Sequence, residues 1–348
     1  MNVSAPRRLA IDFARGFALM GMMIEHLVPT EGATTSLGRV VTMVSEWFAG
    51  KSASLFFVLV GMSLAIQMGE SRFERSYFIF IVRRAFALIL LGVILHLTLW
   101  PTEVLMAIGC ALPLAALIRA GGKWMIGGVA VALILLIPVL SPVGHAWMAH
   151  DWNDSGEPIL SASSALKLIF VDGCYPLMPW LVFILLGILA VDLKLKKTIG
   201  LVVSASLALA TGLLVLWLHP AASSVFAIEW VPTSIPFLFI CGGVAFAVVF
   251  GLEAWEGKFQ KFKLASWHAA IGRTSLSHYV GHILLVVLPL RHWYPAEEWP
   301  TRIGVLTLAG YLVFAVCFSE FWLRRFKRGP VEWLVSLISG SERRSFAG

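Results

Sequence analysis

Charged residues are scarce in this sequence, and their scarcity excludes an ordinary soluble domain. Only 14% of the 348 residues are Asp, Glu, Lys or Arg, whereas soluble domains average about 25%. Hydrophobic residues make up 59% of the chain. The composition therefore predicts an all-α polytopic membrane protein.

Cysteines are also few, and their spacing excludes a disulfide framework or a zinc site. The four lie far apart, mostly within apolar runs, so we expect them only to pack: Cys110, Cys174, Cys241 and Cys317. The chain lacks a detectable internal repeat, a low-complexity tract and a soluble segment, which favours a single integral-membrane domain over residues 1–348. The first apolar run has no small-residue cleavage site and is expected to be a retained helix.

Apolar windows of about 20 residues predict where the chain crosses the membrane. About ten spans result, which places both termini on the same side. The predicted spans are 9–28, 52–68, 77–99, 103–118, 124–141, 176–192, 198–217, 234–252, 269–290 and 302–323.

Lysine and arginine outnumber the acidic residues by seven. This excess does not indicate a nucleic-acid partner, because the basic residues sort by loop as the positive-inside rule expects. With cytoplasmic termini, only five of the 27 fall on the opposite side: Arg39, Lys51, Lys167, Arg291 and Arg302. The sequence therefore predicts cytoplasmic N- and C-termini and membrane lipids as surroundings.

Two further segments carry expectations. Residues 142–175, rich in Trp, Asp and Gly, are predicted to form a long outer loop: a functional lid, a re-entrant binding segment or an ordinary surface loop. Residues 330–340, PVEWLVSLISG, follow a basic run and are expected to lie along the inner membrane interface.

The first predicted helix holds Arg15 and His26 at the two ends of RGFALMGMMIEH. An α-helix brings these side chains to one face, about 16 Å apart along its axis. Ionisable side chains are costly within a membrane and usually face an interior or an aqueous cavity, so we expect this face to line a cavity. Asp12 lies three residues before Arg15 and four after Arg8, which predicts an ion pair that orients Arg15.

Four arginines lie at similar predicted depth, about 6 to 9 Å from the cytoplasmic ends of their helices: Arg15, Arg83, Arg84 and Arg273. They either extend to the cytoplasmic interface or together bind an anion, because the guanidinium group matches phosphate geometry. A nucleotide-linked donor that enters from the cytoplasm fits the second reading.

The outer half of the predicted bundle gathers three histidines and two carboxylates: Glu25, His26, His96, Glu103 and His282. Each histidine alone is compatible with a hydrogen-bonded core residue. Together they favour a reaction site, since histidine suits general-base catalysis near neutral pH and a carboxylate can hold its tautomer.

His278 and His282 are four residues apart, which raises the alternative of a metal site. No acidic residue stands between them, and His278 lies deeper toward the arginines, so we expect no metal. Gly61, in the middle of FFVLVGMS, is expected to permit close helix packing.

Five segments in order resemble the YeiB-like family of bacterial inner-membrane proteins. They are RRLAIDFARGFALMGM, GKSASLFFVLVGMSLAI, RRAFALILLGVILHLTLWPTEVL, IGRTSLSHYVGHIL and RRFKRGPVEWL. That family resembles the transmembrane acyltransferases, which include the lysosomal heparan-glucosaminide acetyltransferase and bacterial enzymes that O-acylate surface glycans. The glycan group has a motif of an arginine, ten residues and a histidine, and Arg15 and His26 keep that spacing.

The resemblance implies an enzyme in the bacterial inner membrane that moves an acyl group, acetyl above all, from cytoplasmic acyl-coenzyme A to an extracytoplasmic sugar or glycolipid. It implies His26 as the catalytic residue and Arg15 as a donor-site or structural arginine. The inner arginines would then meet the coenzyme A phosphates, and Glu25 or Glu103 would assist His26.

Two other classes of function stay open at this stage. A transporter or exporter of an anionic or lipid-linked substrate would also use intramembrane arginines, with histidines relaying protons. The inverted repeats typical of many transporters are not detectable in this sequence. A membrane scaffold without catalysis is the third possibility, and it predicts no need for the histidines.

Overall fold

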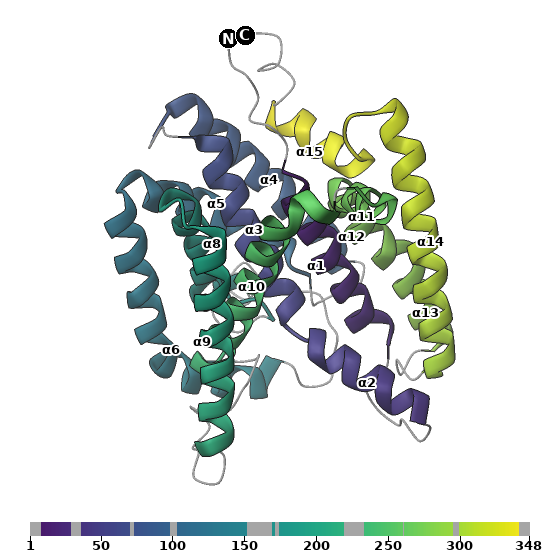
Figure 1. Cartoon of the computed structure of the whole chain (residues 1–348), viewed down its shortest axis with the longest axis horizontal. Coiled ribbons are helices and arrows are strands. Elements are labelled where there is room, and N and C mark those ends of the chain that lie inside the picture. Colours follow the sequence, from purple (N-terminus) through teal and green to yellow (C-terminus); the bar gives the residue numbers. More distant parts are fainter. Residues whose placement is uncertain are drawn as a thin grey trace. The chain divides into compact units, whose positions relative to one another are not determined.

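The computed structural model describes residues 8–28, 36–69, 73–97, 103–151, 169–170, 174–218, 233–259, 261–294 and 299–340. These ranges are mainly helical and contain no strand, in agreement with the predicted all-α class. The chain divides into two compact units (Figure 1). Unit 1 consists of Met1–Phe56 and Val248–Leu334, and unit 2 consists of Phe57–Ala247 and Val335–Gly348.

Unit 1 is organised around α1 (Leu9–Leu27), whose small residues at four-residue spacing form a buried stripe. Ala10, Ala14 and Ala18 are at most 1% exposed, and such small side chains let neighbouring helices approach closely. The neighbours that pack on α1 are α2 (Ser36–Phe48), α11 (Lys263–Arg273), α12 (Ser275–His282) and α14 (Thr301–Arg325).

Unit 2 pairs its helices in chain order (Figure 1). Its elements are most of α3 (Lys51–Met68), α4 (Arg75–Leu97), α5 (Leu105–Ala120), α6 (Lys123–Asp151), α8 (Leu177–Asp192), α9 (Lys197–Leu218) and the first half of α10 (Ile235–Phe259). The helix α4 lies beside α5, and α6 lies beside α8. The last helix, α15 (Pro330–Ser339), begins in unit 1 and ends in unit 2.

The core of unit 2 is centred on Trp180 of α8, which is fully buried. Its indole packs at steep angles against the rings of Phe57, Tyr175 and Phe183, and its Nε1–H donates to the Thr233 hydroxyl at 3.1 Å. A buried tryptophan needs such an acceptor for its single polar group. This cluster joins α3 to α8.

Close approach of α3 and α8 depends on Gly61, as the sequence predicted. A Cβ at this position would overlap the backbone carbonyl of Ile184. Only glycine allows two helix backbones to come this near. The prediction of a packing role for Gly61 is therefore confirmed.

Three helix ends meet at one end of unit 2. Arg119, only 5% exposed, donates to both carboxylate oxygens of Asp192 at 3.0 and 2.8 Å and to the Gly69 carbonyl at 2.7 Å. These residues end α5, α8 and α3 respectively. The predicted alternation of spans requires the C-terminal ends of α3, α5 and α8 to lie on the same side of the membrane, and these contacts agree with it.

Five helical stretches of the described chain are long and apolar enough to cross a membrane: Gly38–Met68, Arg75–Leu97, Lys197–Leu218, Ile235–Phe259 and Thr301–Arg325. The helix α9 also exposes Leu209, Leu216 and Trp217 at 64 to 77%, an apolar surface that water would disfavour. The protein is a membrane protein. The full number of ten spans and the cytoplasmic placement of the termini stay predictions.

The predicted span 269–290 is not one continuous α-helix. It consists of the end of α11, then α12, a π-helical turn η3 (Ile283–Val287) and α13 (Leu288–Trp293). The Thr274 hydroxyl bonds back to the Ala270 carbonyl at 3.1 Å, which competes with regular helix geometry. Pro289 lacks an N–H for the preceding turn, which explains the π-helical turn before it.

Two other sequence expectations change. The segment 142–175 is not loop from its start, because α6 continues to Asp151; most of its remaining residues lie outside the described ranges. The helix α2 was not predicted. The expected interfacial helix at 330–340 corresponds to α15, which is helical as predicted.

Candidate active site

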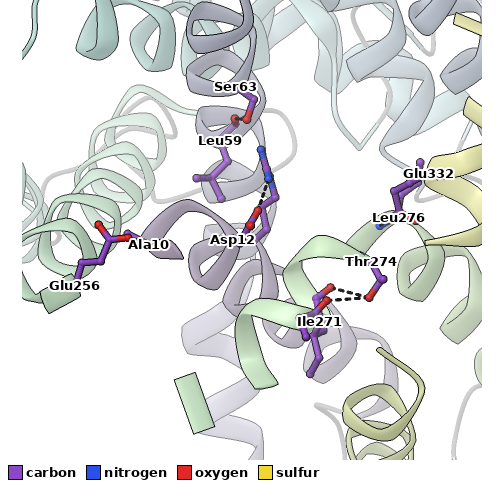
Figure 2. A network of polar contacts seen from close by, with 11 residues as sticks. Ala10, Asp12, Leu59, Ser63, Glu256, Ile271, Thr274, Leu276 and Glu332 are labelled. Carbon is purple, nitrogen blue, oxygen red and sulfur yellow. Dashed lines mark hydrogen bonds and ion pairs between the residues drawn. The ribbon is translucent and has the colours of Figure 1, made fainter. Parts of the chain in front are cut away.

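Two helices of unit 1 cross at the inner arginines. A Cβ at Gly272 of α11 would overlap the Asp12 carbonyl of α1, so the two backbones touch here. Asp12 is 3% exposed and accepts from Arg15 Nη1 at 2.8 Å, as Figure 2 shows for the Asp12 carboxylate. Arg273 follows Gly272 directly and is half-buried. The crossing therefore places α11 against the turn of α1 that holds Asp12, and the predicted ion pair of Asp12 with Arg15 is confirmed.

Arg8, the other predicted neighbour of Asp12, pairs with a carboxylate of α10. Its Nη1 lies 3.3 Å from Glu253 Oε1 near the end of α10. The Ala10 N–H donates to Glu256 Oε1 at 3.2 Å (Figure 2). The beginning of α1 is thus fixed to the end of α10 within unit 1.

At the other end of α1, His26 meets His282 of α12. The Nδ1 of His26 lies 2.9 Å from the Nε2 of His282, and the two rings are nearly parallel at 8°. His282 is fully buried, whereas His26 is half-buried. The structure therefore joins two of the three histidines that the sequence placed in the outer layer.

A backbone carbonyl fixes the tautomers of this pair. His282 Nδ1 lies 3.0 Å from the His278 carbonyl oxygen. A carbonyl can only accept, so this Nδ1 carries the proton, and the Nε2 of a neutral His282 is an acceptor. The proton between the rings must then belong to Nδ1 of His26. The lone pair of a neutral His26 consequently lies on its Nε2.

Polar groups of α14 continue this cluster. The Tyr311 hydroxyl donates to the His278 carbonyl at 3.2 Å, and His278 Nε2 lies 2.8 Å from the Ser319 hydroxyl. Ser319 in turn lies 2.8 Å from the Thr274 hydroxyl at the break between α11 and α12. Figure 2 shows Thr274 beside Ile271, to whose carbonyl its hydroxyl also bonds back.

Sequence reasoning missed Tyr311 and Ser319. The available signal was two polar side chains eight residues apart on one face of an otherwise apolar span, where buried polar groups need partners. The geometry does not favour the metal alternative for His278 and His282. The Nε2 of His278 contacts the Ser319 hydroxyl, whereas the Nε2 of His282 contacts His26. Among the described residues, no group of three potential ligand side chains is present.

Glu25, the neighbour of His26 in sequence, faces the start of α3. The Gly50 N–H donates to Glu25 Oε2 at 3.4 Å. This bond satisfies the amide just before the first turn of α3. The His26 Nδ1 uses His282 rather than a carboxylate as its partner.

The remaining candidates belong to unit 2. Glu103 is 6% exposed and accepts from the backbone amides of Leu105 and Met106 at 2.6 and 3.1 Å, so it caps α5. It also lies against Gly92 of α4, one turn before His96, which is half-buried. On the same helix Arg83 is exposed and Arg84 is half-buried. Their predicted catalytic and donor-binding roles stay predictions.

Family models cover nearly the whole chain. Residues 7–207 match the catalytic domain of heparan-alpha-glucosaminide N-acetyltransferase. The chain belongs to the heparan-alpha-glucosaminide N-acetyltransferase catalytic family. Residues 186–340 also match a family described as a protein of unknown function, DUF418, which is YeiB-like, and both predicted resemblances are thereby confirmed. No curated protein matches the chain.

The two matched segments meet at the histidine pair. His26 lies in the segment that matches the heparan-alpha-glucosaminide N-acetyltransferase family, and His282 lies in the segment that matches DUF418. Membership in the acetyltransferase family indicates a membrane acetyltransferase type of function. The candidate active site is thus assembled from both matched parts of the chain.

Proposed function

We propose that the protein is a membrane acyltransferase that moves an acetyl group from cytoplasmic acetyl-coenzyme A to a hydroxyl or amine of an extracytoplasmic glycan or glycolipid. The observation that carries the proposal is the bond from His26 Nδ1 to His282 Nε2. It leaves the lone pair of His26 on Nε2, where a general base needs it.

In the proposed reaction, Nε2 of His26 takes the proton of the acceptor as the acceptor oxygen or nitrogen attacks the thioester carbonyl. A new C–O or C–N bond forms and the C–S bond breaks. Coenzyme A leaves as a thiolate and takes up the proton released from His26. His282 holds the His26 tautomer and stabilises the imidazolium through the same hydrogen bond. Attack of the same lone pair on the thioester, which gives an acyl-histidine, is a variant of this reaction.

The donor would bind through its phosphates at the inner arginines. The bond from Arg15 Nη1 to Asp12 orients this guanidinium, and a guanidinium matches phosphate geometry. Arg273 follows Gly272, the residue at which α11 touches α1, and would supply a second guanidinium. We also propose Arg83 and Arg84 as donor-binding residues. The proposed location is the inner membrane of a bacterium.

The bond of His282 to the His278 carbonyl weighs against a proton relay that runs through His282, as the transporter alternative would need. A proton relay needs a continuous series of groups that both donate and accept. Here the Nδ1–H of His282 and the hydroxyl of Tyr311 both donate to the same carbonyl, that of His278. A carbonyl that accepts two donors passes no proton on, so the cluster holds His282 in place.

The test is transfer of labelled acetyl groups from acetyl-coenzyme A to membrane or envelope glycans by purified protein. We expect His26→Ala and His26→Gln to lose at least about 100-fold in rate, since general-base catalysis contributes about 10²- to 10⁴-fold. The exposed His292 supplies the matched control, His292→Ala, which should keep wild-type rates. Wild-type transfer by His26→Ala at normal abundance would refute the mechanism.

A further inference from the structure

The beginning of α12 is capped by a residue more than fifty positions away in the chain. The amides in the first turn of a helix have no acceptor within that helix. Leu276 and Ser277 donate their N–H groups to Glu332 Oε1 at 2.7 and 3.2 Å, and the Ser277 hydroxyl bonds to Glu332 Oε2. Figure 2 shows Glu332 beside Leu276. We call this arrangement the Glu332 cap.

The three residues before Glu332 each favour this contact. A Cβ at Gly329 would overlap Glu332 Oε2 and lie 2.6 Å from the Ser277 hydroxyl oxygen, so a larger residue here would displace the two side chains that form the cap. Pro330 starts α15, where its missing N–H costs nothing. The Val331 N–H donates to the Ser277 hydroxyl at 3.0 Å. Residues 329–332 (GPVE) therefore pack as one unit against residues 274–277 (TSLS) at the start of α12.

The cap fixes the helix that carries the histidine pair. Both His278 and His282 lie on α12, within two turns of the capped amides. The break at Thr274 separates α12 from α11, so α11 alone does not determine how α12 is rotated or placed along its axis. A carboxyl group at the start of α12 supplies that constraint through two backbone bonds.

We infer that Glu332 is a positioning residue of the proposed acyl transfer, acting through α12 on the bond between His282 and His26. This inference rests on the proposed function. A neutral carboxyl group would serve equally well, because its carbonyl oxygen accepts from the amides and its hydroxyl donates to Ser277. Glutamine has the same shape and the same donor and acceptor pattern, so it should replace Glu332.

The experiment compares Glu332→Ala, Glu332→Gln and Ser277→Ala with wild type, and uses the exposed Glu46 for the control Glu46→Ala. Labelled acetyl transfer gives kcat and the KM for acetyl-coenzyme A. Hydrogen exchange of the peptide that spans α12 gives a second measurement that does not depend on activity.

We expect Glu332→Ala to lower kcat about 10- to 100-fold with KM within about twofold, since small misplacement of reacting groups costs up to about 10²-fold. The α12 amides should exchange at least about tenfold faster, Ser277→Ala should give an intermediate effect, and Glu332→Gln should stay near wild type.

Three outcomes overturn the inference. One is full activity of Glu332→Ala with unchanged exchange in α12. Another is a loss of activity that merely follows the fraction of folded protein. The third is failure of Glu332→Gln to restore function in correctly folded protein. If wild type itself transfers no acetyl group, the proposed function fails, and the exchange of α12 alone decides whether the Glu332 cap exists.

Discussion

Replacing His282 by glutamine or by asparagine tests its two hydrogen bonds one at a time, because each variant can keep a different one. The amide of glutamine occupies the place of the imidazole Nε2 and can accept from His26. The shorter asparagine amide occupies the place of Nδ1 and can donate only to the His278 carbonyl. In the wild type these contacts are 2.9 and 3.0 Å long. The two variants therefore differ in whether His26 keeps its partner.

The magnitude follows from the burial of the pair. In His282→Asn the Nδ1–H of the half-buried His26 loses its acceptor, and a polar group that loses its hydrogen bond away from water costs about 1 to 3 kcal/mol. At about 1.36 kcal/mol for each factor of ten in rate, this cost corresponds to about 5- to 150-fold. We expect His282→Asn to lose activity in this range, because the hydrogen bond that favours the productive tautomer of His26 is then missing. His282→Gln should lose less than about tenfold.

The assay is single-turnover acetyl transfer from labelled acetyl-coenzyme A, normalised to folded protein. Equal rates for the two variants, or a near wild-type rate for His282→Ala, would refute the tautomer argument. The double variant of His26→Ala with His282→Ala adds a second test. Its rate should match that of His26→Ala alone, since residues that act as a unit are not additive.

Three further predictions concern packing, pH dependence and donor binding. Gly61→Ala should destabilise the folded protein by about 1 to 3 kcal/mol through overlap with the Ile184 carbonyl, as measured by thermal unfolding in detergent. Burial raises the pKa of Glu332, so its stabilising contribution is full below the ordinary glutamate pKa and is lost as the pH rises through the raised value. The Tm of wild type minus that of Glu332→Gln should therefore fall across this window. Arg15→Gln should weaken acetyl-coenzyme A binding about 10- to 100-fold, seen as a smaller ligand-induced thermal shift.

Each of these predictions has a result that would contradict it, and the first also has a control variant. A Cβ at Gly127 meets nothing within 4 Å, so Gly127→Ala should not destabilise, and equal effects at the two glycines would contradict the packing argument. A difference in Tm that is independent of pH, or that rises with pH, would contradict the assigned pKa direction of Glu332. No thermal shift of wild type at millimolar acetyl-coenzyme A would favour the transporter class instead.

Much of the fold follows from local properties of the sequence. Runs of apolar residues predict helices because lipid forces each backbone to satisfy its own hydrogen bonds. The predicted spans 52–68 and 198–217 agree with α3 and α9 to within a residue. The irregular backbone of 269–290 was not foreseen, since Thr274 and Pro289 interrupt a run that is apolar on average. The helix α2 was missed because its charged and polar residues lower its mean hydropathy.

The sequence predicted which residues belong to the candidate site but not which of them contact each other. The spacing of Asp12 and Arg15 lies within one helix, where an α-helix of known pitch fixes which side chains meet. For His26 the sequence offered Glu25, Glu103, His96 and His282 as companions at similar depth. Depth along a helix says nothing about rotation or about which helices are neighbours, so the sequence left that choice open.

By itself, the sequence determined that this chain belongs in a membrane, that it is helical, and that ionisable groups stand at both ends of its first long helix. These features depend on composition and on the fixed rise and turn of an α-helix. Only the tertiary structure decided that His26 pairs with His282, that the His278 carbonyl sets their tautomers, and that Glu332 caps α12. Each of these contacts joins residues that are distant in the chain or turned by a helix break, and side-chain packing between helices alone brings them together.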